Sequence, residues 1–425
     1  MNRTVHPERR AIVWVLLGLV ALVSPIAACD EEPEPSGDAD ADGDGDGDGD
    51  GDGDGDADAD ADGDGDGDGD ADTDADTDAD EERSAEIDVP ASDPHLLYTG
   101  RFDQSDPDAP RCGWSGCAVT AWVDASSVSV IIDDLGGENF VNVVVDQGEP
   151  TVLDLEPGPV EYVVADGLAP GTHSVQIFRR TESFFGELAM GDWTLEDALP
   201  LRVPQVPDRE MVFVGDSITC GYGNEGAGPD CAFSADTENA YLAYGAVLAR
   251  RLDAAYTGIA WSGKGIYRNY DGGQDELMPE LYERTLPRDA SSQWPFSDEP
   301  DVIVINLGTN DFASGTPPRD AFVSAYLAFV ERLREVSPDA HIVCTNGPML
   351  SDSWPAGESQ LTTIRSYLQD VVDARLAAGD DRVHQMELEE QQESDGLGCD
   401  WHPSVLTHEI MADALEGPIR EALGW

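Results

Sequence analysis

The sequence predicts a two-part fold, with a β-sandwich over residues 84–206 and an α/β domain over residues 207–425. Between about Leu96 and Leu201, apolar and polar residues alternate in short runs separated by Gly, Pro and Asp. This spacing is typical of a sandwich of short strands. From Pro207 onward, apolar runs alternate with amphipathic stretches long enough for helices. That alternation favours a parallel sheet covered by helices on both faces.

In the first part, the clearest strand candidates have period-two alternation. They are residues 118–133, 139–146 and 173–180. No stretch here has a sustained helical period, and only residues 186–199 could contain one helical turn.

In the second part, the strand candidates are apolar runs that end in polar or glycine-containing motifs. These are residues 211–217, 253–263, 301–311, 341–349 and 382–390. The amphipathic stretches between and after them predict helices over residues 238–252, 320–336, 358–378 and 403–423. In sheets of this kind, reactive groups collect beyond the carboxyl ends of the strands.

The N-terminus predicts export. Arg9 and Arg10 precede an apolar run over residues 11–22, and small residues lead to Cys29. This pattern is typical of a signal peptide over residues 1–28, and it is too short for a membrane span. It resembles a bacterial lipobox, which implies cleavage before Cys29, acylation of its sulfur, and a lipoprotein held at a membrane, periplasmic or on the cell surface. The alternative is an ordinary cleaved signal.

Residues 29–83 predict a solvated tether. Every even position from 38 to 80 is Asp, which gives 22 aspartates separated by Gly, Ala or Thr. Such a segment buries no apolar surface and repels itself. Calcium binding is a second interpretation, although uniform repetition lacks the defined ligand ring of a calcium loop. Without these aspartates the formal net charge of −65 would still be −43, which argues against nucleic acid as a partner.

Six cysteines remain besides Cys29, an even number in a chain predicted to be exported, so disulfides are expected. Short spacing suggests two pairs, and elimination leaves a third. The expected pairs are Cys112 with Cys117, Cys220 with Cys231, and Cys344 with Cys399.

Four motifs follow separate strand candidates or lie in the last loop. They contain Ser217 in GDSIT, Gly263 in WSGKG, Asn310 in GTND and His402 in DWHPS. Each motif alone is weak evidence, because the same residues form turns or helix caps. Their occurrence together, each beyond a separate strand or in the final loop, predicts one site.

These residue types suit acyl transfer. A serine becomes nucleophilic beside an imidazole, so we expect Ser217 as nucleophile and His402 as general base. Asp400 is the adjacent carboxylate that could orient the imidazole. The backbone N–H groups of Ser217 and Gly263 and the side chain of Asn310 would form an oxyanion hole.

The four motifs are similar to the sequence blocks of SGNH hydrolases, also called GDSL-like esterases, over roughly residues 210–425. With the preceding sandwich, the wordings CGYGNEG, WSGKGIYRNY and DWHPS look like carbohydrate esterase family 2. The resemblance implies an SGNH-type, flavodoxin-like three-layer sheet after a jelly-roll-like sandwich. It also implies a serine esterase that removes acetyl groups from plant polysaccharides such as xylan and glucomannan. No metal and no cofactor are implied.

One residue departs from the SGNH pattern. That pattern usually places Asp three residues before the histidine, where this chain has Cys399, and Asp400 stands two before it. Some members of the family of closest resemblance use a Ser–His dyad with a backbone carbonyl in place of the carboxylate. Both a triad with Asp400 and a dyad are therefore open.

Acetylated polysaccharide is the expected partner. Trp401, beside the histidine, and Trp354 could stack on sugar rings, although either could pack in the core. Two other functions remain: an SGNH esterase or lipase acting on another acyl ester, and a surface lipoprotein that binds glycan without turnover.

Overall fold

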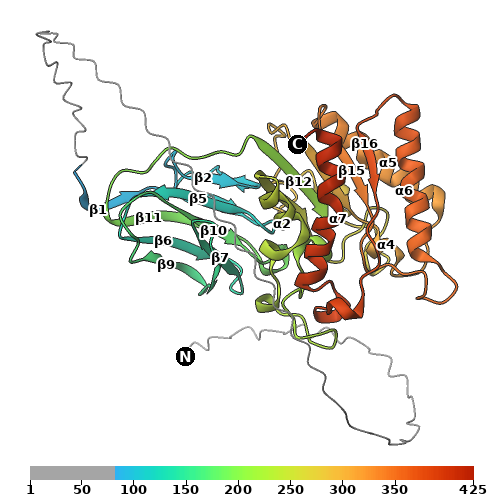
Figure 1. Ribbon diagram of the computed structural model, residues 1–425, viewed down its shortest axis with the longest axis horizontal. Helices are drawn as coiled ribbons and strands as arrows, with labels where there is room; N and C mark the ends of the chain where they lie inside the picture. Colours follow the sequence, from blue (N-terminus) through green and yellow to red (C-terminus); the bar gives the residue numbers. More distant parts are fainter. Residues whose placement is uncertain (1–81) are drawn as a thin grey trace, which may run out of the picture. The chain divides into compact units, whose positions relative to one another are not determined.

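The computed structural model describes residues 82–425 (Figure 1). The predicted signal peptide, the predicted lipidation site at Cys29 and nearly all of the predicted tether lie outside the described residues. Within the described part of the chain, no helix is both long and apolar enough to cross a membrane.

Two antiparallel sheets form the first part of the described chain. The first contains β1 (Ser84–Val89), β3 (Phe102–Asp103), β4 (Arg111–Cys112), β6 (Ser127–Asp134), β9 (Gly158–Asp166) and β11 (Leu188–Ala198), in the order β3-β4-β11-β6-β9 with β1 also paired to β11. The second contains β2 (Leu97–Thr99), β5 (Ala118–Val123), β7 (Phe140–Val145), β8 (Thr151–Asp154) and β10 (His173–Arg179), in the order β2-β5-β10-β7-β8. The β-rich first part is confirmed.

The helical turn allowed within residues 186–199 was wrong, because this stretch forms the long strand β11, which pairs with β1, β4 and β6. Its register with β6 shifts between Met190 and Trp193. Gly191 lies in this bulge, and a side chain there would meet Ile131 at 2.9 Å. The bulge interrupts the period-two pattern, which hid the strand from a periodicity argument.

The third sheet is parallel, as predicted. Its strands are β12 (Arg209–Gly215), β13 (Ala254–Ala260), β14 (Val302–Asn306), β15 (His341–Thr345) and β16 (Val383–Met386), in the order β13-β12-β14-β15-β16. This is the 2-1-3-4-5 order of flavodoxin-like folds.

Helices cover both faces of this sheet (Figure 1). The α-helices are α1 (Ser217–Cys220), α2 (Tyr244–Arg251), α3 (Met278–Leu281), α4 (Thr309–Phe312), α5 (Arg319–Val336), α6 (Gln360–Ala377) and α7 (Val405–Leu423). Short 3-10 helices are η1 (Ser183–Phe185), η2 (Ala235–Thr237), η3 (Ala240–Leu242), η4 (Glu393–Asp395) and η5 (Cys399–Trp401). Alternate residues of β12 explain the two layers: Met211 and Phe213 pack with α2 and α7, whereas Val212 and Val214 join the cluster that includes α5 and α6.

The register of the third sheet places the motifs together. Gly215 at the end of β12 pairs with Ala260 at the end of β13 and with Asn306 at the end of β14. The segments after these three strands carry Ser217, Gly263 and Asn310. They therefore leave the sheet at the same edge, as expected for a parallel sheet.

The cysteines do not pair as spacing suggested. Within residues 82–425 there is one disulfide, between Cys231 and Cys399, and the other four cysteines of this range are buried free thiols. The predicted pairs Cys220–Cys231 and Cys344–Cys399 are wrong, because Cys231 and Cys399 bond to each other across 168 residues. Cys344 is a buried residue within β15, between β14 and β16 in the parallel sheet. The predicted pair Cys112–Cys117 is wrong as well, because both residues are free thiols, although they lie close to each other.

Candidate active site

Ser217 is the first residue of α1, directly beyond β12. Asp216 caps this short helix, because its Oδ1 accepts a hydrogen bond from the Ile218 N–H at 3.0 Å. Gly215 permits the tight turn, since a Cβ there would lie 1.9 Å from Thr219 Oγ1. The Ser217 side chain is thus fixed at the carboxyl edge of the sheet.

His402 lies in the loop before α7 and meets Ser217 across 185 positions of sequence. Its Nε2 is 2.9 Å from Ser217 Oγ. Its Nδ1 is 3.2 Å from the backbone carbonyl oxygens of both Cys399 and Asp400. Because carbonyls only accept hydrogen bonds, Nδ1 carries the hydrogen, and the Nε2 lone pair faces the serine hydroxyl. The predicted meeting of these two side chains is confirmed.

The electrostatic surroundings of His402 favour the neutral imidazole. Burial lowers its pKa to about 4, and the two carbonyls offset only part of that effect. The group that faces the serine is therefore unprotonated at neutral pH and able to accept a proton.

The carboxylate of Asp400 does not orient the imidazole. Its Oδ2 accepts a hydrogen bond from the Tyr222 hydroxyl at 2.9 Å, and within residues 82–425 no hydrogen bond joins it to His402. Asp400 and Trp401 have left-handed backbones, with φ of 51° and 64°, and the carbonyl of Asp400 faces the ring in place of its side chain. The triad expectation for Asp400 is corrected to contact through its backbone.

Tyr222 supports the other side of the imidazole. Its ring centroid lies 4.2 Å from that of His402, and the same ring stacks on Phe233 with the centroids 3.6 Å apart. The ring of His402 is thus held by an aromatic face as well as by the two carbonyls.

Residues 261–264, here called the oxyanion loop, follow β13. The Trp261 N–H donates to the Gly215 carbonyl at 3.3 Å, which joins this loop to the strand before Ser217. Gly263 has a left-handed φ of 79°, which glycine adopts without penalty. Among the hydrogen bonds of the described residues, neither the Gly263 N–H nor the Ser217 N–H has a partner. Both are available to a developing anion.

Asn310 links the two loops. Its Nδ2 donates to the Lys264 carbonyl at 2.8 Å and to Asp216 Oδ2 at 3.2 Å. The predicted oxyanion donor therefore lies between the nucleophile turn and the oxyanion loop, with both of its amide hydrogens engaged.

Asp311 is a supporting residue that sequence reasoning missed, although it stands in the GTND motif. Its carboxylate accepts hydrogen bonds from the backbone N–H groups of Ile266, Tyr267 and Arg268, at 3.1, 2.7 and 2.9 Å. Burial raises its pKa to about 6, against the effect of these bonds. It fixes the chain just beyond the oxyanion loop. Burial likewise raises the pKa of Asp216 to about 7.

The two tryptophans are both exposed. Trp401 is 53% exposed and directly precedes His402, whereas Trp354 is 75% exposed and lies between β15 and α6. No ring contact joins either of them to another described aromatic residue. The alternative of core packing is thereby excluded for both.

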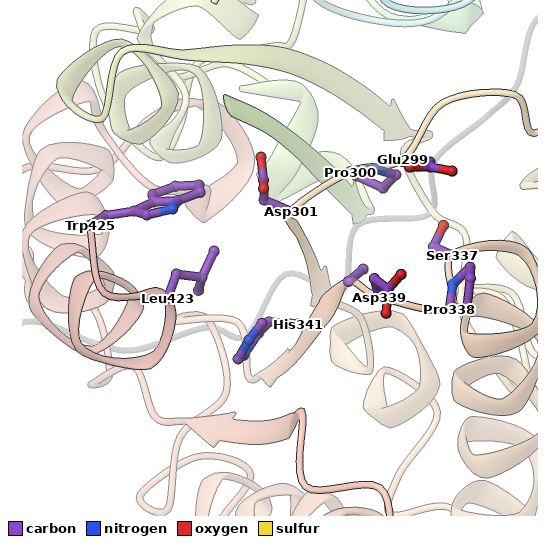
Figure 2. Close-up of a pocket in the computed structure, with 10 residues that line it drawn as sticks. Glu299, Pro300, Asp301, Ser337, Pro338, Asp339, His341, Leu423 and Trp425 are labelled. Atoms are coloured by element: carbon purple, nitrogen blue, oxygen red, sulfur yellow. The ribbon is translucent and has the colours of Figure 1, made fainter. Parts of the chain in front are cut away.

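A cavity of about 350 Å³ lies elsewhere on the sheet (Figure 2). Its lining includes Asp301, directly before β14, and His341, the first residue of β15. These residues mark the amino ends of the strands, opposite the edge that carries Ser217. This cavity is not part of the catalytic arrangement.

Comparison with known families divides the chain as its structure does. Residues 98–204 match the carbohydrate esterase 2 N-terminal family, and residues 213–410 match the GDSL-like lipase/acylhydrolase family.

Individual relatives agree. The chain is 40% identical over 333 residues to the cellulase/esterase CelE of Acetivibrio thermocellus, covering 78% of this chain and 40% of the length of CelE. It is 33% identical over 335 residues to an acetylxylan esterase/glucomannan deacetylase of Cellvibrio japonicus, covering 75% of this chain and 88% of that protein.

Solved structures extend this agreement. A family two carbohydrate esterase from Clostridium thermocellum, solved with cellohexaose, superposes with a TM-score of 0.73 at 40% identity. The match covers 78% of this chain and 99% of that one. With the hydroxyl, the imidazole and the free N–H groups at one sheet edge, the chain belongs to carbohydrate esterase family 2, as a serine esterase of the GDSL-like type.

Proposed function

We propose that the chain is a carbohydrate O-acetyl esterase that works through an acetyl-Ser217 intermediate. The observation that carries the proposal is the 2.9 Å approach of His402 Nε2 to Ser217 Oγ, with Nδ1 turned to backbone carbonyls. This geometry suits removal of the hydroxyl proton as the oxygen attacks a carbonyl carbon.

The reaction has two balanced halves. Ser217 Oγ attacks the acetyl carbonyl and its proton passes to His402; the tetrahedral species then collapses, and His402 returns the proton to the departing sugar oxygen. In the second half, His402 removes a proton from water, the hydroxide oxygen attacks the acetyl group, and the proton returns to Ser217 Oγ. The products are a sugar hydroxyl and acetate.

The oxyanion would bind three donors. Two are the N–H groups of Ser217 and Gly263, which have no partner among the described residues. The third is Asn310 Nδ2, whose 3.2 Å bond to Asp216 is the longer of its two and the one an anion would replace. Each such donor contributes about 10²-fold or more to the rate of acyl transfer in serine hydrolases.

The proposal that the substrate is acetylated xylan or glucomannan rests on the names of the relatives. Two Cellvibrio japonicus relatives are named acetylxylan esterase/glucomannan deacetylase. Exposed Trp401, directly before the catalytic imidazole, supports a substrate with flat sugar faces.

The decisive test compares wild type with Ser217→Ala on a chromogenic acetyl ester. We expect turnover by the wild type and a loss of about 10⁴-fold or more in the variant. Equal rates would contradict the proposal. A series of acyl lengths then separates deacetylation from other esterase activity, because a preference for octanoyl over acetyl esters would assign a different acyl group. Acetate release from acetylated xylan, glucomannan and other acetylated polysaccharides identifies the natural substrate.

We further propose that the protein is exported and anchored through a lipid on Cys29. The support is the sequence pattern before this residue and the acidic stretch after it. Labelled fatty acid should enter the wild type and not Cys29→Ala. An unlabelled wild-type protein would exclude the anchor.

A further inference from the structure

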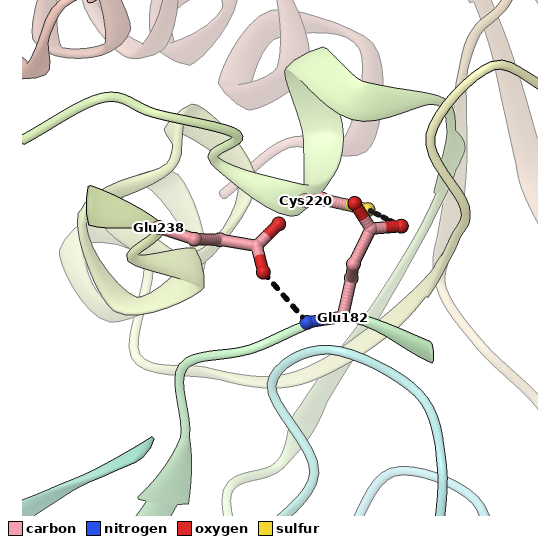
Figure 3. A group of neighbouring side chains, drawn as sticks. All are labelled: Glu182, Cys220 and Glu238. Atoms are coloured by element: carbon pink, nitrogen blue, oxygen red, sulfur yellow. Dashed lines mark hydrogen bonds between the residues drawn. The ribbon is translucent and has the colours of Figure 1, made fainter. Parts of the chain in front are cut away.

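Three side chains that the mechanism does not use meet where the sandwich contacts the α/β part. Glu182 follows β10, Cys220 ends α1, and Glu238 follows η2; all three are completely buried. One ligand atom of each lies within 4.8 Å of the others. Figure 3 shows the two carboxyl groups converging, with the Cys220 sulfur beside that of Glu182.

The contacts of Glu182 lead directly to the oxyanion loop. Its Oε2 accepts a hydrogen bond from the Ser262 N–H at 2.9 Å, and its Oε1 accepts one from the Ser262 hydroxyl. Ser262 immediately precedes Gly263. A residue contributed by the sandwich therefore fixes the peptide next to the predicted oxyanion donor.

Glu238 fixes Glu182 in turn. Its Oε2 accepts a hydrogen bond from the backbone N–H of Glu182 at 2.8 Å. Arginines tie the same two backbones: Arg179 donates to the Glu182 carbonyl at 2.9 Å, and Arg180 donates to the Glu238 carbonyl at 3.1 Å. Of the four carboxyl oxygens, only Glu238 Oε1 lacks a partner among the described residues.

The open oxygen indicates a missing hydrogen. Two ionised carboxylates in contact and without solvent repel each other and lose their hydration, so such a pair retains a proton. Burial raises the pKa of both groups. A hydrogen on Glu238 Oε1 would satisfy this atom and donate to the neighbouring carboxylate of Glu182.

We propose that Glu182 and Glu238 share one proton, and that this pair makes Glu182 a positioning residue for the oxyanion loop. The role in catalysis rests on the proposed esterase function; the shared proton does not. With the proton on Glu238, the carboxylate of Glu182 accepts both bonds from Ser262 and a further one from the Glu238 acid.

A bound metal ion fits these contacts less well. Both oxygens of Glu182 and one of Glu238 already accept hydrogen bonds, so an ion would have to compete with Ser262 and with the Glu182 N–H. Burial also raises the pKa of the Cys220 thiol, which disfavours the thiolate that a metal requires. One proton satisfies the open oxygen without moving any of these groups.

The kinetic test uses the full chain with Glu182→Ala, Glu238→Ala and Glu238→Gln, and with Glu161→Ala on the exposed face of β9 as a control. Displacing the oxyanion loop should lower kcat about 100-fold in both buried alanine variants, with KM changed less than about threefold. Glu238→Gln should recover most of that rate, because its amide donates one hydrogen bond and accepts another, as the protonated acid does.

A milder variant guards against misfolding. Ser262→Ala removes only the hydroxyl bond to Glu182 and should lower kcat about tenfold at an unchanged melting temperature. If Glu182→Ala folds and keeps its kcat, or if Glu238→Gln is as slow as Glu238→Ala, the positioning role is wrong.

The shared proton can be detected by a measurement that does not depend on enzyme activity. Infrared difference spectra at neutral pH, wild type minus Glu238→Gln, should show the carbonyl stretch of a buried carboxylic acid, whereas a band from Asp216, whose pKa burial raises to about 7, is common to both proteins and cancels. An identical spectrum in the two proteins, or a stoichiometric metal in the purified wild type, would overturn the shared proton. Because this measurement ignores activity, it remains decisive even if the esterase assignment fails.

Discussion

Replacing Asp400 with Asn tests how His402 is oriented. In a triad, loss of the carboxylate leaves the imidazole in the wrong tautomer and costs about 10⁴-fold in kcat. Here the Nδ1 hydrogen faces the carbonyl oxygens of Cys399 and Asp400, each at 3.2 Å, and Asp400→Asn changes neither carbonyl. The carboxylate instead accepts from Tyr222, and Asn can accept the same bond.

The remaining effect of the Asp400 charge is modest. An exposed carboxylate near the imidazolium stabilises it by up to about 1 kcal/mol after solvent screening. This corresponds to about a fivefold fall in kcat for Asp400→Asn. Steady-state kinetics on an acetyl ester measure it, with His402→Ala as the reference for a lost base and Tyr222→Phe as the control for the hydrogen bond. A fall of about 10³-fold or more in Asp400→Asn would refute the dyad.

Three further predictions concern pH, the disulfide and the aromatic residues. The neutral imidazole of His402 is the active form, and burial lowers its pKa to about 4. We therefore expect kcat/KM to stay constant through weakly acidic pH and to fall only as the pH drops through about 4. A loss of half of kcat/KM near pH 6.5 would contradict this prediction. Replacing Cys231 and Cys399 together with Ser should lower the free energy of unfolding by up to about 5 kcal/mol, since the bond closes a loop across 168 residues. Dithiothreitol should lower the melting temperature of the wild type and leave the double variant unchanged, and equal sensitivity of both would refute the assignment. Trp401→Ala and Trp354→Ala should raise KM on acetylated polysaccharide severalfold and leave KM on a small acetyl ester unchanged, whereas equal effects on both substrates would exclude sugar stacking.

Periodicity was sufficient for most of the fold. The five strands of the parallel sheet and the long helices α5, α6 and α7 lie where apolar runs and amphipathic stretches alternate. Periodicity did not predict β11, because a bulge near Gly191 shifts the alternation of apolar and polar residues within this strand.

The sequence predicted those site residues whose role follows from a single motif. Ser217 and His402 meet because both stand beyond the carboxyl edge of one sheet, a consequence of strand order. The role of Asp400 was not readable, since it depends on a left-handed backbone that turns the carbonyl, rather than the side chain, to the ring. The role of Glu182 could not be predicted from the sequence either, because this residue lies in the first, β-rich part of the chain and acts through Ser262.

Disulfide pairing failed for a related reason. Short spacing predicts that cysteines near in sequence pair. Cys220, however, belongs to helix α1 and lies in the buried cluster beside Glu182. Cys231, in the loop after it, reaches Cys399 instead. Pairing depends on which loops meet at the site, and sequence spacing does not record that.

The disulfide between Cys231 and Cys399 also explains how a backbone carbonyl can orient the imidazole in place of a carboxylate. A side chain can be oriented by its own torsions, whereas a carbonyl points correctly only if the backbone is held. Cys399 is held by the bond to Cys231, by its N–H donating to the Gly223 carbonyl at 2.9 Å, and by the close packing of Gly223, where a Cβ would lie 2.7 Å from Cys399 Cβ. The loop closes on itself where the Gly398 N–H donates to the His402 carbonyl at 2.8 Å. At the position where a triad would have its acid, this chain has a cross-linked backbone, and a neutral acceptor there is consistent with the lowered pKa of His402.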